Sequence, residues 1–164
     1  MALDTSRKIV GVWNETYTGD LGSVVKVHKV DHTLSMATGT SNSQADEVWS
    51  DTRSAAGAVD DLDLAGTLTA ADGSTITFVE VTGVYIRNKS TTTAETLTIG
   101  AGSNPFITWL IATGDGVVIG PNGTFLIESP VDGYTVTAGT ADILRVDPGA
   151  NTISYDIVIW GRSA

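Results

Sequence analysis

The chain has 164 residues, a length typical of one domain, with a net charge of −10 and no cysteine. Its 41% hydrophobic and 17% charged residues exclude a disordered chain, its acidity argues against nucleic-acid binding, and the missing cysteines exclude disulfide and thiolate chemistry. Val, Ile and Thr supply 53 of the residues. Because β-branched side chains favour strands, the composition predicts an all-β protein.

Residues 1–46 form the first predicted unit. Its apolar residues come in small groups, Ile9 to Trp13 and Val24 to Val30, separated by Gly-rich breaks. Thr38–Ser43 resembles a linker, which places a boundary after residue 46. Two hypotheses stay open: an extended arm that packs on its own domain or on neighbouring subunits, or extra strands of the main sandwich.

The sequence predicts neither a secretory signal nor a membrane segment. Arg7 and Lys8 are not followed by the apolar region of a signal peptide, and no apolar run approaches the length that spans a bilayer. We therefore expect a protein made in a cytoplasm, with no membrane partner.

Residues 47–164 predict an antiparallel β-sandwich. Short strands alternate with turn signals such as Asp72-Gly73 and Pro121-Asn122-Gly123, at the spacing typical of sandwiches and small barrels. The predicted strands are 74–82, 83–89, 96–99, 106–112, 116–119, 124–128, 134–137, 143–146 and 152–160. In the last strand one face carries Ile153, Tyr155, Ile157 and Ile159, and the other carries Ser154, Asp156, Val158 and Trp160.

Two groups of residues invite a metal-site interpretation, and neither supports it. His28 and His32 lie in a strand pattern, where four residues span about 13 Å, too far for one ion. Asp60, Asp61 and Asp63 lack the rest of a calcium loop, and Leu62 and Leu64 between them indicate a short strand. No nucleophile elbow, phosphate loop or dinucleotide motif occurs. We expect no catalytic, cofactor or metal site, and no enzyme.

The four tryptophans, Trp13, Trp49, Trp109 and Trp160, could form a sugar-stacking platform. Trp109 lies in an apolar run and is expected in the core. Trp13 and Trp49 have polar neighbours and are the better candidates for contacts. A carbohydrate-binding module is therefore one alternative function.

The stretch from Glu47 to Gly161 resembles small β-sandwich proteins encoded in the structural gene clusters of tailed phages. The resemblance rests on EVWSDTRSAAGAVDDLDLAGTLTAADGSTITFVEVTGVYIRNKS, on AETLTIG, on a Pro-Asn-Gly turn followed by TFLIESPVDGYTVTAGTADILRV, and on TISYDIVIWGRS. It covers about two-thirds of the chain, and residues 1–46 fall outside it.

This resemblance implies a virion structural protein with a jelly-roll-like domain that docks on a capsid or tail lattice. Our first hypothesis is a capsid decoration (cement) protein that binds the major capsid protein lattice and stabilises the assembled shell. A trimer suits the three-fold positions of a capsid, so we expect a homotrimer. A phage tail or fibre component is the second hypothesis.

Overall fold

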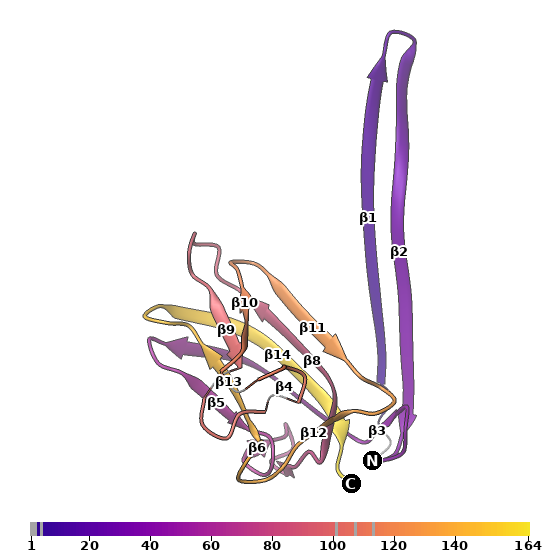
Figure 1. Ribbon diagram of the computed structural model, residues 1–164. Helices are drawn as coiled ribbons and strands as arrows, with labels where there is room; N and C mark the ends of the chain where they lie inside the picture. The colour runs from indigo at the N-terminus through magenta and orange to yellow at the C-terminus, as the bar shows by residue number, and fades with distance from the viewer. Residues whose placement is uncertain (1–2, 4, 101, 107, 113) are drawn as a thin grey trace.

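The computed structural model describes residues 3, 5–100, 102–106, 108–112 and 114–164, and in these residues every regular element is a strand. Figure 1 shows a body of short strands and one long hairpin that projects from it. The strands are β1 (Thr5–Gly19), β2 (Gly22–Thr38), β3 (Gln44–Ala45), β4 (Glu47–Ala56), β5 (Asp60–Asp63), β6 (Leu68–Thr69), β7 (Thr75–Ile76), β8 (Glu80–Asn88), β9 (Leu97–Gly100), β10 (Gly116–Ile119), β11 (Thr124–Glu128), β12 (Tyr134–Thr135), β13 (Ile143–Asp147) and β14 (Thr152–Arg162). The expected all-β class is confirmed.

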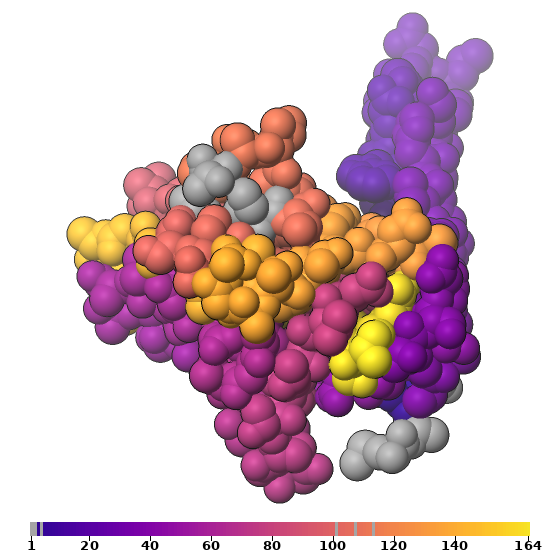
Figure 2. All heavy atoms as spheres, turned by 60° about the horizontal axis from the view of Figure 1, so that its bottom comes forward, coloured from indigo at the N-terminus to yellow at the C-terminus, as the bar shows by residue number. Residues whose placement is uncertain are grey.

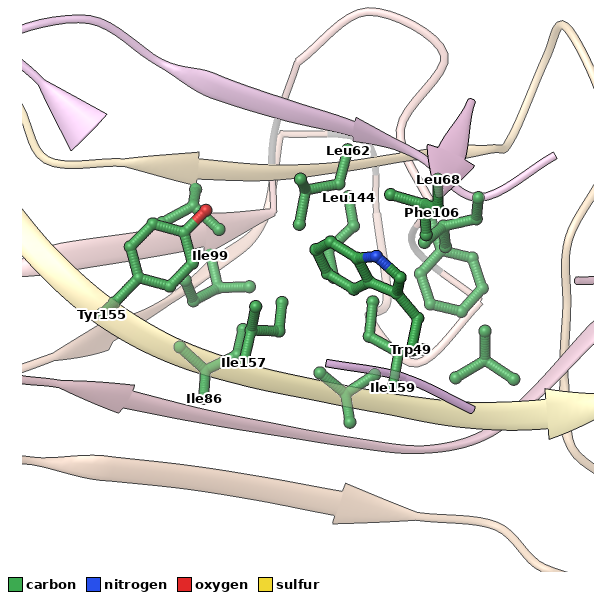
Figure 3. Close-up of a cluster of buried hydrophobic side chains, with 14 of the residues drawn as sticks. Trp49, Leu62, Leu68, Ile86, Ile99, Phe106, Leu144, Tyr155, Ile157 and Ile159 are labelled. Atoms are coloured by element: carbon green, nitrogen blue, oxygen red, sulfur yellow. The ribbon is translucent and has the colours of Figure 1, made fainter. Parts of the chain in front are cut away.

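Two antiparallel sheets form most of the body, residues 47–164, and β6 and β7 pair separately as a two-stranded sheet. One has the strand order β11-β8-β14-β4, with β12 also paired to β8. The other has the order β10-β9-β13-β5. Figure 3 shows side chains from both sheets meeting between them, so the body is sandwich-like.

The core forms because β14 alternates apolar and polar residues. Ile153, Tyr155, Ile157 and Ile159 are fully buried on the inner face, as the sequence pattern predicted. They meet side chains from the opposite sheet, among them Leu62, Ile99 and Leu144. Each large side chain buried in this way contributes roughly 1.5–3 kcal/mol, so the central strand accounts for much of the stability of the body.

Strands β1 and β2 form a hairpin whose register runs without interruption from Thr5↔Met36 to Gly19↔Gly22. At about 3.4 Å per residue, its 15 pairs give a ribbon about 50 Å long. The hairpin lies within predicted residues 1–46, and the alternating segment at 24–30 belongs to β2. Within the described part of the chain, only β3, two residues long, pairs with β2 on its other side, near the base of the hairpin.

Two of the predicted strands are wrong. The predicted strand at 74–82 is interrupted between β7 and β8. There the amide of Phe78 donates to the carbonyl of Leu64, and the chain passes from the β6–β7 pair to the sheet that contains β8. The run at 106–112 is a loop, and residue 107 lies outside the described residues. Phe106 is buried and Trp109 packs against Phe125, so this apolar run covers one end of the core without pairing as a strand.

Asp60 joins the two sheets at one end of the sandwich. Its carboxylate accepts hydrogen bonds from Arg53 Nε at 2.7 Å, Arg53 Nη2 at 2.9 Å and the Tyr155 hydroxyl at 2.7 Å. Burial alone raises the pKa of Asp60, but the hydrogen bonds from Arg53 and Tyr155 outweigh burial and hold this pKa below its usual value. Burial in turn raises the pKa of Tyr155, so its hydroxyl stays protonated and donates.

We expect Asp60→Asn to lower the free energy of unfolding at pH 7 by about 2 kcal/mol, because it removes a charged acceptor of three hydrogen bonds. A depressed carboxyl pKa stabilises the fold above the unfolded-state pKa, and this stabilisation is lost as the pH falls through the folded-state pKa. The cost of the variant should therefore shrink in acid. Urea unfolding at pH 7 and pH 3 measures it, with Tyr155→Phe as the control for the loss of one hydrogen bond. An equal cost at both pH values would contradict the argument.

Candidate interaction surface

The hairpin presents apolar side chains on both of its faces. Strand alternation and the β1–β2 register place one set on the face that carries Arg7, and the other on the opposite face. We call the first set the aromatic face, which comprises Ile9, Trp13, Tyr17, Val24 and Val30. We call the second set the valine face, which comprises Val10, Val12, Val25 and Val27. All nine side chains are between 38% and 67% exposed.

This exposure is unusual for a ribbon of such length. Figure 2 shows the hairpin as a narrow projection beside the broad body. An isolated two-stranded hairpin is at best marginally stable in water, and its free edges invite further pairing. Contiguous exposed apolar residues mark interaction sites in soluble proteins. The hairpin is therefore the first candidate interaction surface of this chain.

Trp13 lies along the ribbon rather than away from it. A Cβ atom added at Gly11 would lie 2.5 Å from the indole of Trp13, so the ring covers the glycine. The absence of a side chain at Gly11 thus lets the indole lie flat and present its outer surface. A flat aromatic ring on a strand is a suitable anchor for a protein–protein contact.

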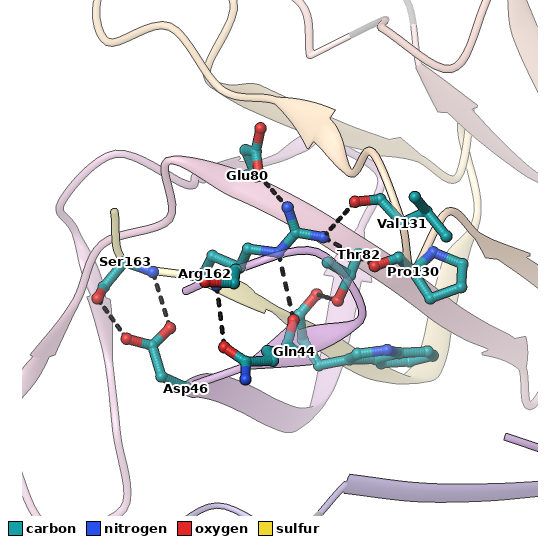
Figure 4. Close-up of polar contacts among 10 residues, drawn as sticks. Gln44, Asp46, Glu80, Thr82, Pro130, Val131, Arg162 and Ser163 are labelled. Carbon is teal, nitrogen blue, oxygen red and sulfur yellow. Dashed lines mark hydrogen bonds and ion pairs between the residues drawn. The ribbon is translucent and has the colours of Figure 1, made fainter. Parts of the chain in front are cut away.

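The base of the hairpin is fixed to the body by Arg162 (Figure 4). This residue ends β14 and is only 2% exposed. Its Nε donates to the carbonyl of Gln44 in β3 at 3.2 Å, and Nη2 donates to the carbonyls of Pro130 and Val131 at 2.8 and 2.9 Å. Nη1 pairs with the carboxylate of Glu80 in β8. One guanidinium therefore joins β3, β8, β14 and the loop after β11.

A second attachment lies on the first strand of the hairpin. Arg7 forms a two-bond ion pair with Glu128 of β11, with 2.9 Å between Nε and Oε1, and its Nη1 lies 3.1 Å from His32 Nδ1. Below this pair Met36, Ala45 and Trp160 form a small buried apolar cluster, separate from the main core. The hairpin base is thus held by polar and apolar contacts together.

An apolar groove of about 490 Å³ opens between the hairpin base and the outer face of the β11-β8-β14-β4 sheet. Leu126, Tyr85 and Val158 are register neighbours across three strands and line it with Val48. Trp160 borders the groove, and β1 lines the opposite side from Thr5 to Ile9. The Trp160 Nε1 and Thr5 Oγ1 atoms are buried there without a hydrogen-bond partner among the described residues.

An acidic rim flanks this groove. Asp46, Glu47 and Asp72 line an adjacent hollow of about 390 Å³, which shares Leu3 and Val48 with the groove. Burial raises the pKa of Glu47, and the charges of Asp46 and Asp72 raise it further. The rim therefore favours a cationic neighbour.

Charge divides between the two parts of the chain. Residues 5–38 contain four Lys or Arg, three Asp or Glu and both histidines, whereas residues 47–164 contain five Lys or Arg and 14 Asp or Glu. The hairpin thus carries a net +1 and the body a net −9. Two bodies repel each other, whereas a hairpin and a body do not.

The predicted site residues are distributed as follows. His28 and His32 lie on the hairpin, with Glu15 3.6 Å from His28. Asp60 and Asp61 pair with Arg53 and Arg145, and Asp63 caps the turn at Ala65. Among the described residues, no group of three or more His, Asp or Glu side chains is arranged to hold a metal ion.

The expectation that Trp49 is a contact residue is wrong. Trp49 is 5% exposed in the core, and its indole donates to the Thr69 carbonyl at 3.2 Å. Trp109 packs on the core as expected, and Trp160 is buried under the hairpin base although it lies on the polar side of β14. Trp13 alone of the four is exposed. The sequence did not predict the role of Arg162, because nothing in Gly161-Arg162-Ser163 indicates that the arginine side chain is buried.

No helix long and apolar enough to cross a membrane occurs in the residues that the structure describes. Comparison of the chain with protein-family models, curated proteins and solved structures found no match.

We expect Arg162→Met to lower the free energy of unfolding by about 3 kcal/mol or more, because it leaves a partly buried carboxylate and three carbonyl groups without their donor. Arg145→Met is the matched control, since Arg145 also forms a two-bond pair with Asp61 but at the surface. The control should cost less than about 1 kcal/mol. Equal costs in urea unfolding would show that burial of Arg162 contributes nothing.

Gly83 should be intolerant of any side chain. A Cβ atom there would lie 2.1 Å from the Trp160 ring, so Gly83→Ala must displace the indole that borders the groove. We expect a loss of about 1–3 kcal/mol in the free energy of unfolding. Gly120→Ala is the control, because a Cβ at Gly120 meets no atom within 4 Å. A variant at Gly83 as stable as the control would contradict the packing argument.

Proposed function

We propose that this chain is a virion structural protein of a tailed phage, of the capsid-decoration type, and that it binds and stabilises the assembled shell as a homotrimer. The observation that carries the proposal is the exposed apolar hairpin on an acidic, sandwich-like body. A decoration protein acts by binding, so it requires a stiff fold and an adhesive surface, and no catalytic group. The phage origin itself rests on the resemblance of residues 47–161.

The order of the strands supports a jelly roll for the body. Leaving aside the two-residue β12, the two sheets contain eight strands, which along the chain are β4, β5, β8, β9, β10, β11, β13 and β14. One sheet then has the order first, eighth, third, sixth, and the other has the order second, seventh, fourth, fifth. This is the arrangement of two interlocked Greek keys, a fold that viral capsid proteins use.

The hairpin supports the part of the proposal that assigns residues 1–46 to an N-terminal arm. In a decoration protein, residues 1–46 would reach from the body to the lattice of major capsid protein, and the hairpin is long enough to do so. The valine face lies on the opposite side of the ribbon from the face that continues into the groove, so we assign it to the shell. Binding to the assembled lattice but not to free subunits would stabilise the shell by mass action.

The charge of the body fits a position on the outside of a virion, after synthesis in the host cytoplasm. Its net −9 repels packaged nucleic acid and keeps free copies soluble before assembly. A tail or fibre component would use the same hairpin on a different lattice, so location decides between the two. Trp49 lies in the core and cannot stack on a sugar, so the carbohydrate-binding alternative has one candidate residue fewer.

The test uses purified heads and purified tails from particles that lack this protein. We expect the chain to co-sediment with heads, and Val12→Ser combined with Val27→Ser to weaken this binding at least about tenfold, because two exposed apolar side chains no longer become buried. Val118→Ser is the control, since Val118 is an exposed strand valine on the edge of the body. Binding to tails alone would replace the decoration role by the tail role. Binding to neither would overturn the proposal.

A further inference from the structure

We propose that the aromatic face of the hairpin of one copy lies in the apolar groove of a second copy, beside the acidic rim. The inference deepens the homotrimer of the proposed function, on which it rests for the number of copies. It assigns a separate role to each face of the hairpin: the aromatic face joins copies to one another, and the valine face contacts the shell.

The hairpin cannot fill its own groove. Ile9 lines that groove, but Trp13 lies four residues further along β1, about 14 Å away, and Tyr17 about 27 Å away. A body of this length is about 35 Å across, shorter than the ribbon of about 50 Å. The outer two-thirds of the aromatic face, beyond Ile9, therefore lies outside its own groove, where a neighbouring copy can receive it.

The two surfaces match in chemistry. The groove offers the side chains of Tyr85, Leu126 and Val158, and the aromatic face offers Trp13, Tyr17 and Val30. Lys26 lies on the same face of the ribbon as Trp13, because it pairs with Glu15 in the register. The ammonium group of Lys26, which has Glu15 opposite it on the same face, suits the rim of Asp46, Glu47 and Asp72.

The charges of the whole chain favour the same pairing. Two bodies, each at net −9, repel each other, whereas a hairpin at net +1 can approach a body. Body-to-body association is therefore disfavoured, and a contact of a hairpin with a body has the more favourable charge. This also favours a second copy over a basic partner, which would bind the body but not the hairpin.

The part of the aromatic face beyond Ile9 is about 35 Å long and about 10 Å wide, so one contact buries about 350 Å² on each copy and about 700 Å² over both. A closed ring of three such contacts buries about 2,100 Å² in total, which lies in the range of stable assemblies. Donor and acceptor are different surfaces, so the contact is heterologous and must close into a ring to be finite. Three copies close such a ring in the proposed function, each giving one hairpin and receiving one.

The test uses two variants with complementary defects. Trp13→Ser with Tyr17→Ser removes the donor and leaves the groove intact. Val158→Lys places a charge in the groove and leaves the hairpin intact. Sedimentation velocity at about 10 µM should show the unchanged chain as a closed oligomer and each variant alone as a monomer. Each variant should associate at least about tenfold more weakly, because the first lacks two anchor residues and the second lacks an apolar groove. Their equimolar mixture should form a heterodimer, since one intact contact remains.

A single contact lacks the gain from ring closure, so the mixture is followed up to about 100 µM. Ser154→Lys, which adds the same charge to the same strand and face, is the control and should remain oligomeric. Circular dichroism checks that Val158→Lys folds, with Leu126→Lys as the replacement if it does not. The valine-face variant, Val12→Ser with Val27→Ser, should remain oligomeric.

Three outcomes would overturn the inference: a monomeric unchanged chain, a donor or groove variant that stays oligomeric, or a mixture that stays monomeric. Head binding is scored separately. If the mixture fails to associate while the unchanged chain still binds heads, the hairpin–groove contact is wrong and the decoration role stands. If the mixture associates while no particle is bound, the contact stands and the decoration role is wrong.

Discussion

The buried guanidinium of Arg162 holds together the parts of this chain that its function requires. It donates to the carbonyl of Gln44 on the hairpin side and to those of Pro130 and Val131 on the body side, and it pairs with Glu80. Five donors in a planar fork can meet several acceptors at once, which a lysine could not do. Together with the Arg7–Glu128 ion pair and the cluster around Trp160, this junction gives the β1–β2 ribbon a defined direction relative to the body.

The direction of the ribbon matters because exposing its apolar side chains to water is unfavourable in free energy. A two-stranded hairpin with apolar residues on both faces is stabilised little by its own packing. It stays folded because its base is packed against the body and ion-paired to it. Arg7 with Glu128, and Met36 with Trp160, extend the attachment along the first turns of the ribbon. A rigid base lets side chains far along the ribbon meet a partner without a further loss of conformational freedom.

The division of charge then restricts what the ribbon can meet. The body is strongly acidic, and the ribbon is not. The groove combines an apolar floor with a rim of three carboxylates, Asp46, Glu47 and Asp72. Burial, with the charges of Asp46 and Asp72, raises the pKa of Glu47, so a cation placed beside this rim would be favourable.

Composition and residue pattern predicted the all-β class, most strands of the body and the inner face of β14, because β-branched content and the period-2 pattern report local preference and burial directly. They could not separate an apolar loop from a strand at 106–112, since Phe106 and Trp109 cover the core without pairing. They also could not decide that Trp49 faces inward, that Trp160 lies under the hairpin, or that Arg162 is buried. Those outcomes depend on which strands become neighbours in space, and neighbours far apart in the chain leave no local pattern to detect.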